Sequence, residues 1–137
     1  MIRQQTPTDG AQRPIIPTQR LTIRTEDSTG AVVVYVAGEI DLATAPTLQT
    51  CLTAQLECST QHPVLVVDLA AVDFISCAGL RVLLEAQQHA AVHGTAFRLA
   101  GCSRVVLRLL NLADLHGEFD SYPTVRDALG WSARRQA

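Results

Sequence analysis

The feature that most constrains this sequence is the run PVLVVDLA at positions 63–70. A short and almost uninterrupted apolar run of this kind is typical of a strand that is covered on both faces. Segments with helical spacing of apolar residues stand on both sides of it, from about Ala45 to Cys58 and from about Cys77 to Gly94. A buried strand between two helices predicts an α/β fold with a mostly parallel sheet.

The remaining segments continue this alternation. LTIRT and AVVVYVA, joined by the turn-rich EDSTG, predict a hairpin whose second strand is the more buried. TAFRLA predicts a strand, RVVLRLLNL a helix that Ser103 can cap, EFDSY a short strand, and VRDALGW a last helix with Thr124 as its N-cap. The order β-β-α-β-α-β-α-β-α implies right-handed crossovers and a mixed sheet with the hairpin as its antiparallel edge.

Composition limits the domain organisation and the partners. The 137 residues, 47% of them hydrophobic and 18% charged, predict one globular domain at 20–132, a flexible tail at 1–19 and a short C-terminal tail at 133–137. A net charge of -2 does not indicate binding to nucleic acid or to an anionic membrane, since both attract positively charged proteins. The sequence has no apolar run of the roughly 18 residues that cross a membrane and no secretory signal, so we expect a cytoplasmic protein.

The stretch DFISCAGLR at 73–81 carries the clearest sign of a site. We expect it to leave the carboxyl end of the buried strand by a short loop and to enter a helix, where α/β domains place ligand sites. Ser76 and Cys77 occupy the helix start, whose free N–H groups favour an anion such as a phosphate or a thiolate. The small Ala78 and Gly79 would let another molecule approach the backbone. Alternatively, Ser76 is only an N-cap and Cys77 a small filler.

Catalytic and metal-binding interpretations of this stretch have little support. A cysteine phosphatase loop needs an arginine six residues after its nucleophile, and Leu83 stands six residues after Cys77. His89 and His93 lie four apart on a polar helix face, where we expect solvated side chains, and a metal bound to them would lack an evident third ligand. We therefore expect neither a cysteine-dependent enzyme nor a metal site.

The four cysteines fit a reducing compartment. Cys51 and Cys58 are seven apart on one predicted helix, roughly 10 Å, which is beyond the reach of a disulfide. Cys77 and Cys102 follow parallel strands and are the only pair that the topology could bring together. Because a helix start makes a cysteine more reactive, we expect mild oxidation to modify Cys77 before Cys51 or Cys58, and a link to Cys102 is one form it could take.

Three segments together resemble the STAS domain, which bacterial anti-sigma factor antagonists share with the cytoplasmic tails of sulfate transporters. They are VVVYVAGEIDLATAPTLQ, PVLVVDLAAVDFISCAGLRVLL, and the stretch from RVVLRLLNLADL to FDSYPTVRDAL. The resemblance covers about Leu21 to Trp131. It implies a mixed sheet flanked by about four helices, no catalytic activity and no cofactor.

The resemblance also implies a role for the helix start. In antagonists of this type the loop usually reads Asp-Ser-(Ser/Thr/Ala)-Gly-Leu, and an anti-sigma factor that is also a kinase phosphorylates the serine. The unphosphorylated antagonist captures the anti-sigma factor and frees the sigma factor, and phosphorylation ends the capture. Aligned on Gly79 and Leu80, Cys77 stands at the phosphoacceptor position and Ser76 at the aspartate position. The partner-binding residues that the resemblance implies are Glu39, Asp41, Ser76, Cys77, Ala78, Gly79 and Arg81.

A thiol at this position leaves three kinds of regulation open, because it is not an ordinary substrate of a serine kinase. The protein is constitutively active, or it is switched through Ser76 or another hydroxyl, or it is switched by oxidation of Cys77. The function we expect is that of a bacterial anti-sigma factor antagonist with a kinase-like anti-sigma factor as its partner. The alternative is a soluble STAS subunit of a transporter complex. The sequence leaves the oligomeric state open.

Overall fold

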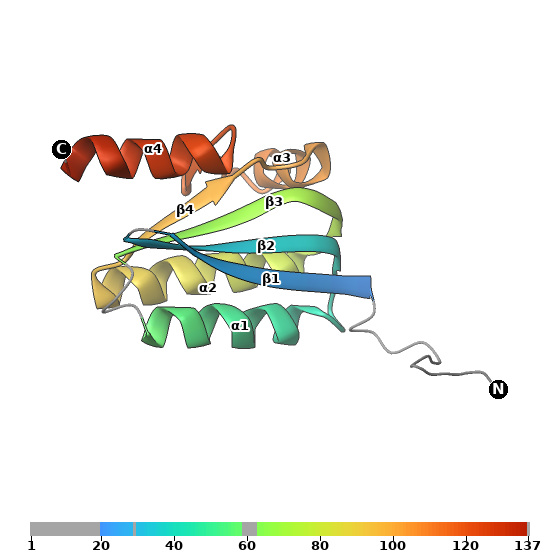
Figure 1. The fold of residues 1–137 in the computed structure, drawn as a ribbon. Coiled ribbons are helices and arrows are strands. Elements are labelled where there is room, and N and C mark those ends of the chain that lie inside the picture. The colour runs from blue at the N-terminus through green and yellow to red at the C-terminus, as the bar shows by residue number, and fades with distance from the viewer. Residues whose placement is uncertain (1–19, 29, 59–62, 137) are drawn as a thin grey trace.

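The computed structural model describes residues 20–28, 30–58 and 63–136, with side chains as far as residue 130. Its strands are β1 (Leu21–Ser28), β2 (Ala31–Ile40), β3 (Val64–Ile75), β4 (Ala96–Ala100) and β5 (Asp120–Tyr122). Its helices are α1 (Ala45–Glu57), α2 (Cys77–His93), α3 (Arg104–Leu112) and α4 (Val125–Gln136). They follow one another in the predicted order (Figure 1). The tail predicted at 1–19 lies outside the described residues.

The strands of the described residues form one sheet in the order β1-β2-β3-β4-β5. β1 pairs antiparallel with β2, in a register that joins Leu21 to Gly38 and Ser28 to Ala31. The other neighbouring strands pair in parallel. The turn of the hairpin ends at Gly30, whose φ of 72° lies in the left-handed region that glycine tolerates. The predicted mixed sheet with an opening hairpin is therefore confirmed.

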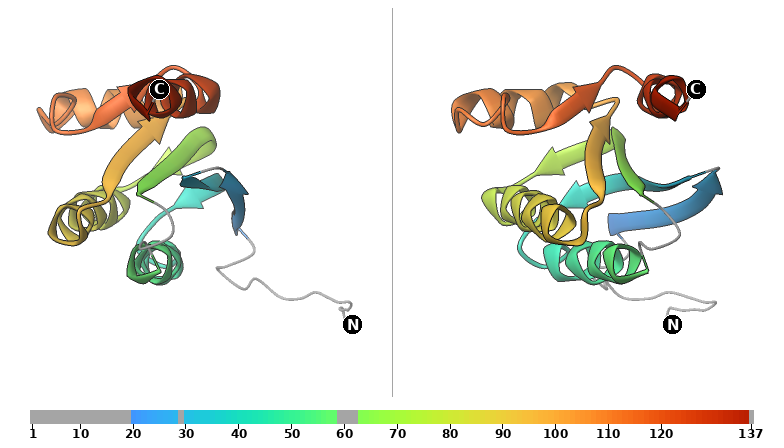
Figure 2. Two further views of the ribbon diagram at one scale, coloured as in Figure 1. Left: turned by 60° about the vertical axis from the view of Figure 1, so that its left-hand side comes forward. Right: turned by 90° about the vertical axis from the view of Figure 1, so that its left-hand side faces the viewer.

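Helices cover both sides of the sheet. Figures 1 and 2 show α1 and α2 on one side and α3 and α4 on the other. Leu48, Leu52 and Leu56 recur on the inner side of α1 and are almost completely buried in the main core cluster. A smaller cluster on the other side includes Ala128 of α4 and Val66 of β3. β3 is therefore covered on both sides, as its continuous apolar run predicts.

β3 is longer than the sequence predicted. The expected strand ended at Ala70 and gave way to a short loop, whereas the observed strand continues to Ile75. The prediction of a loop was wrong because β2 continues to supply backbone partners, with Glu39 opposite Phe74 and Ile40 opposite Ile75 after two register shifts. β3 thereby carries the start of α2 to the end of the sheet.

Two of the predicted helix boundaries depend on single residues. α2 ends at Gly94, as predicted, because the φ of 74° at this C-cap is one that glycine adopts without strain. Ser103 precedes α3 as predicted, but its Oγ makes no capping bond. It donates to the carbonyl of Val72 instead, at 2.9 Å, and so ties the start of α3 to β3.

The last helix begins as the sequence predicts and ends later. Thr124 Oγ1 accepts the N–H of Asp127 at 3.0 Å, which is the predicted N-cap bond. α4 continues to Gln136, past position 132, where we expected the domain to end. No helix among the described residues has the length and apolar character that crossing a membrane requires.

Candidate functional site

The junction between β3 and α2 consists of one residue, Ser76. Its backbone is extended, and its N–H donates to the carbonyl of Ile40 at the end of β2, at 2.8 Å. Its own carbonyl accepts the N–H of Leu80 at 3.0 Å. Cys77 follows as the first residue of α2, and its side chain is exposed. The junction therefore presents the Cys77 thiol to solvent at the end of the sheet.

The Ser76 hydroxyl points into this junction. Its Oγ has almost no accessible surface and no hydrogen-bond partner among the described residues, and it makes no capping bond to α2. A kinase must reach the oxygen atom that it phosphorylates. The burial of Oγ therefore argues against Ser76 as the alternative phosphoacceptor, and Cys77 is the accessible residue at this helix start.

Gly79 is buried against the sheet and does not face solvent. A Cβ atom at this position would lie 2.5 Å from Ile40 Cγ2 and 2.9 Å from Ile75 Cγ1, closer than carbon atoms approach without strain. The prediction that Gly79 lets another molecule approach the backbone is therefore wrong. Its small size lets α2 pack onto the ends of β2 and β3. Ala78 is half-buried and lines a groove beside α1.

Asp41 organises the turn between β2 and α1 with both of its carboxylate oxygens. Oδ1 accepts the N–H groups of Ala43 and Thr44, at 2.9 and 3.0 Å. Oδ2 lies 2.6 Å from Nη2 of Arg20. The bond from the Thr44 N–H is the largest cause that lowers the pKa of the Asp41 carboxyl below its usual 3.8, and the charge of Arg20 adds to it. This carboxylate is thus engaged within the chain.

Thr44 of the same turn is a further structural residue of the site, which the sequence did not predict. It is fully buried, and its Oγ1 accepts the N–H of Asp41 and donates to the carbonyl of Glu39, both at 2.8 Å. These bonds fix the path of the chain from β2 into α1. The Asp-x-x-Thr spacing of Asp41 and Thr44 could have indicated this turn, because short polar side chains commonly form hydrogen bonds to nearby backbone groups in turns.

Arg20 forms ion pairs with both acidic residues of the GEID stretch. Its Nη1 donates to Glu39 Oε1 at 3.1 Å, and its Nη2 to Asp41 Oδ2. Gly38 lets the backbone of β2 lie this close to Arg20. Its φ is 106°, and a Cβ atom there would lie 2.0 Å from the carbonyl oxygen of Arg20. Glu39 and Asp41, expected at a partner-facing edge, therefore meet an arginine of their own chain. Arg20 could not be predicted as part of this site, because a lone arginine at the domain border has no local sequence pattern.

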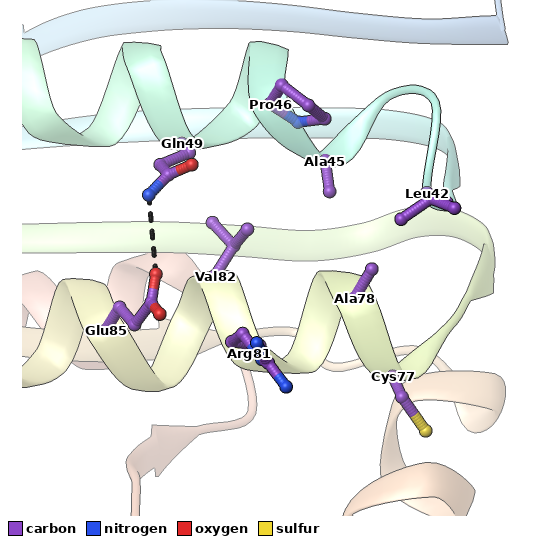
Figure 3. Close-up of a pocket in the computed structure, with 9 residues that line it drawn as sticks. All are labelled: Leu42, Ala45, Pro46, Gln49, Cys77, Ala78, Arg81, Val82 and Glu85. Atoms are coloured by element: carbon purple, nitrogen blue, oxygen red, sulfur yellow. Dashed lines mark hydrogen bonds between the residues drawn. The ribbon is translucent and has the colours of Figure 1, made fainter.

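A groove of about 400 Å³ lies between the N-terminal halves of α1 and α2 (Figure 3). Leu42 and Pro46 contribute to its lining on the α1 side, and Cys77, Ala78 and Arg81 on the α2 side. The Leu42 side chain is 80% exposed at the edge of this groove. Three of the residues that the sequence predicted as partner-binding thus share one surface.

The cysteines are free thiols, and two of them are far apart along the sheet. Ser103, the residue after Cys102, donates to the carbonyl of Val72, and Cys77 lies five residues beyond Val72 along a nearly extended stretch of roughly 15 Å. A disulfide needs Cα atoms within about 7 Å. The link considered between Cys77 and Cys102 therefore does not fit this structure. Burial raises the pKa of the Cys51 and Cys102 thiols.

His89 and His93, the two histidines four residues apart on α2, lie against each other. Nε2 of His89 lies 2.9 Å from Nε2 of His93, and the ring centroids are 4.6 Å apart. Within residues 20–28, 30–58 and 63–136, no three histidine, cysteine or acidic side chains gather closely enough to hold a metal ion.

Residues 22–128, which span the whole sheet and the start of α4, match the STAS domain family. The chain belongs to this family. Among the curated relatives of this STAS chain, the anti-sigma-F factor antagonist RsfA of Mycobacterium tuberculosis is 30% identical over 116 residues, 85% of this chain and 89% of the relative. The antagonist RsfB of the same species is 31% identical over 110 residues, 80% of this chain and 87% of the relative. The resemblance seen in the sequence is confirmed.

Solved structures agree with this assignment. A crystal structure of an anti-sigma factor antagonist from Mycobacterium paratuberculosis is 35% identical, with a TM-score of 0.73 over 80% of this STAS chain and 92% of the other. The antagonist SpoIIAA in its unphosphorylated form is 14% identical, with a TM-score of 0.69 over 82% of this chain and 96% of the other. At that identity the second likeness concerns the fold alone, and it confirms the predicted arrangement of sheet and helices.

Proposed function

We propose that this STAS protein is an anti-sigma factor antagonist, which binds an anti-sigma factor and thereby releases a sigma factor for transcription. Relatives with 30 and 31% identity over most of the chain are named for this function. The observation that carries the proposal is the exposed Cys77 at the first position of α2, where the family resemblance locates partner control. The partner is an anti-sigma factor of the kinase-like type.

The proposed activity is binding rather than catalysis. Around Cys77 the surface offers the exposed apolar side chain of Leu42, the small Ala78 and the charged Arg81. Apolar surface with a few charged groups beside it is characteristic of protein contacts. The neighbouring turn is held rigid by Asp41 and Thr44, so a partner would meet a preformed surface at little entropic cost.

We further propose that phosphorylation does not switch this antagonist at the α2 start. Cys77 offers a thiol where a serine kinase needs a hydroxyl, and the hydroxyl of Ser76 is buried. The antagonist is then active whenever it is present, and its abundance sets the amount of free sigma factor. This action takes place in the cytoplasm, where sigma factors meet RNA polymerase.

The alternative of a transporter subunit has weaker support. The transporter SLC26A9 shares the fold with a TM-score of 0.69, but it is 13% identical and this chain covers 21% of it. At that identity the likeness concerns the fold alone. The curated relatives with higher identity are all named as antagonists of anti-sigma factors.

The test is a displacement assay with purified components. Each kinase-like anti-sigma factor of the source genome is first loaded with its sigma factor, and the STAS protein is then titrated into the complex. Size-exclusion chromatography should show a new complex of the STAS protein with the anti-sigma factor, together with free sigma factor. If every sigma complex survives a large excess of the STAS protein, the proposed function is wrong.

A further inference from the structure

The groove between α1 and α2 has an apolar end beside the turn that leads into α1. Leu42 forms its edge with an 80% exposed side chain, and Pro46 and Val82 also line the groove. Figure 3 shows Ala78 and Val82 directed towards α1, whereas the Cys77 sulfur points away from it. Covering Leu42 removes apolar surface from water, which is favourable. An apolar segment can therefore be stabilised at this end of the groove without burying the thiol.

The charges of the groove do not favour a charged segment. Arg81 and Glu85 both line it, one turn apart on α2, and Glu85 Oε1 accepts a hydrogen bond from Gln49 Nε2 at 3.3 Å. A segment of either sign would meet a like charge as well as an opposite one. The Asp41 carboxylate before α1 is already paired with Arg20. The groove therefore favours an occupant that is apolar and uncharged.

The N-terminal segment, residues 1–19, joins the domain beside this apolar end. Arg20 Nη2 lies 2.6 Å from Asp41 Oδ2, and Leu42 is the next residue after Asp41. The backbone of Arg20 is held as well, because its carbonyl oxygen lies against Gly38. In Figure 1 the start of β1 and the start of α1 lie at the same end of the sheet. The residues just before Arg20 are therefore attached close to Leu42.

Residues 14–17, with the sequence PIIP, have the chemistry that this end of the groove favours. They carry no charge, and they include two adjacent isoleucines. Ile16 stands four residues before Arg20, and four extended residues span up to about 14 Å. The two prolines restrict the backbone at their own positions and at the residues before them, so docking costs less conformational entropy. This stretch can therefore reach the groove and bind there at low cost.

We propose that residues 14–17 dock over Leu42 and Pro46 and cover the apolar end of the groove. A short tether gives the segment an effective concentration in the millimolar range at the groove, so a weak contact is enough to populate the docked state. Cys77 and Arg81 line the same groove, so a molecule that binds there has to displace the segment first. The docked segment is thus an autoinhibitory strap. This consequence rests on the proposed function, whereas the contact itself does not.

Nuclear magnetic resonance of the full chain tests the contact without any partner. In the wild type, nuclear Overhauser contacts should connect the methyl groups of Ile15 or Ile16 with those of Leu42. The double variant Ile15→Asp and Ile16→Asp should lose these contacts and shift the Leu42 methyl resonances. Ile2→Asp is the matched control, because Ile2 stands near the far end of the segment. The Val92 methyl resonances are the internal reference and should not move, since Val92 is 83% exposed near the other end of α2.

Calorimetry with the anti-sigma factor found in the displacement assay tests the autoinhibition. A docked strap raises the apparent Kd by the inverse of the undocked fraction. The double variant should therefore bind about three- to tenfold more tightly than the wild type, the gain expected if the segment is docked in about two-thirds to nine-tenths of the molecules. Ile2→Asp should bind with the affinity of the wild type.

The possible failures differ from one another. If the wild type shows no methyl contacts with Leu42 and the double variant leaves the Leu42 resonances unchanged, the segment does not dock, and the inference is wrong even if the proposed function holds. If the contacts are present but the affinities are equal, the autoinhibitory role is wrong. If the wild type binds no anti-sigma factor, that role falls with the proposed function, while the contact is decided by the resonances alone. If the contacts appear only between differently labelled chains in a mixed sample, the groove receives this segment from a second copy, and the contact within one chain is wrong.

Discussion

Gly79 of α2 lies against Ile40 at the end of β2, so closely that a Cβ atom on Gly79 would be 2.5 Å from Ile40 Cγ2. This contact sets how near the start of α2 approaches the sheet, and hence where Cys77 stands. We predict that Gly79→Ala lowers the free energy of unfolding by about 1–3 kcal/mol through overpacking. Urea unfolding followed by circular dichroism measures this loss.

Gly130→Ala is the control for this prediction. Gly130 also lies inside a helix, but a Cβ atom there would have no atom within 4 Å. Alanine should therefore stabilise α4 by about 0.5–1 kcal/mol through the lower conformational entropy of its unfolded state. If both substitutions stabilise the protein, the close packing of Gly79 is not a constraint.

The lowered pKa of Asp41 predicts a pH dependence of stability. Because the folded state favours the carboxylate, Asp41 stabilises the fold above its unfolded pKa near 3.8, and this contribution is lost as the pH falls through the lower folded pKa. Asp41→Asn should therefore be less stable than the wild type at pH 7, and the difference should shrink below pH 3.8. Urea titrations of both proteins across this range test it. If the two proteins differ by the same amount at pH 7 and below pH 3.8, the Asp41 carboxylate makes no such contribution.

Thiol reactivity should follow exposure. Cys58 and Cys77 are exposed, whereas Cys51 and Cys102 are partly buried and burial raises their pKa. The sequence led us to expect Cys77 to react before Cys58, but because both are exposed we now expect iodoacetamide at neutral pH to modify both of them before Cys51 and Cys102, as measured by mass spectrometry of the native protein over time. Equal rates at all four positions would contradict the burial of Cys51 and Cys102.

Phosphorylation tests the role of the thiol at the α2 start. Incubated with ATP and a kinase-like anti-sigma factor that binds it, the wild type should incorporate almost no phosphate at Ser76 or Cys77. Cys77→Ser should gain a phosphate, because the new hydroxyl stands at the exposed first position of α2. Peptide mapping of Cys77→Ser with and without Ser76→Ala identifies the site. Phosphate on Ser76 of the wild type would show that the junction opens to a kinase.

Local patterns predicted most of the fold. The helical spacing of Leu48, Leu52 and Leu56 gave α1, and Gly94 marked the end of α2. The extension of β3 to Ile75 was not predicted, because exposed residues interrupt its apolar pattern and the pairing with β2 that sustains it is a long-range contact. The apolar pattern describes one segment at a time, so it does not reveal pairing between strands that are distant in the sequence.

The candidate site was predicted less completely, for a related reason. The sequence located Cys77, Ala78 and Arg81 at one helix start, where the structure also has them. It could not distinguish a glycine that opens a surface from one that packs against a core, and Gly79 is the second kind. It also could not pair Arg20 with Asp41, because the two meet only when β1 lies beside β2.

The measurement that tests the account most directly is calorimetric binding of the anti-sigma factor to the wild type and to Cys77→Asp. Cys77 is exposed, so aspartate should leave the unfolding temperature nearly unchanged while it introduces a charge at the centre of the proposed interface. We predict that the wild type binds and that Cys77→Asp weakens binding by about 2–5 kcal/mol, a rise in Kd of about 30-fold or more. Equal affinities of the two proteins would contradict the claim that the α2 start is the surface by which this STAS protein captures its partner.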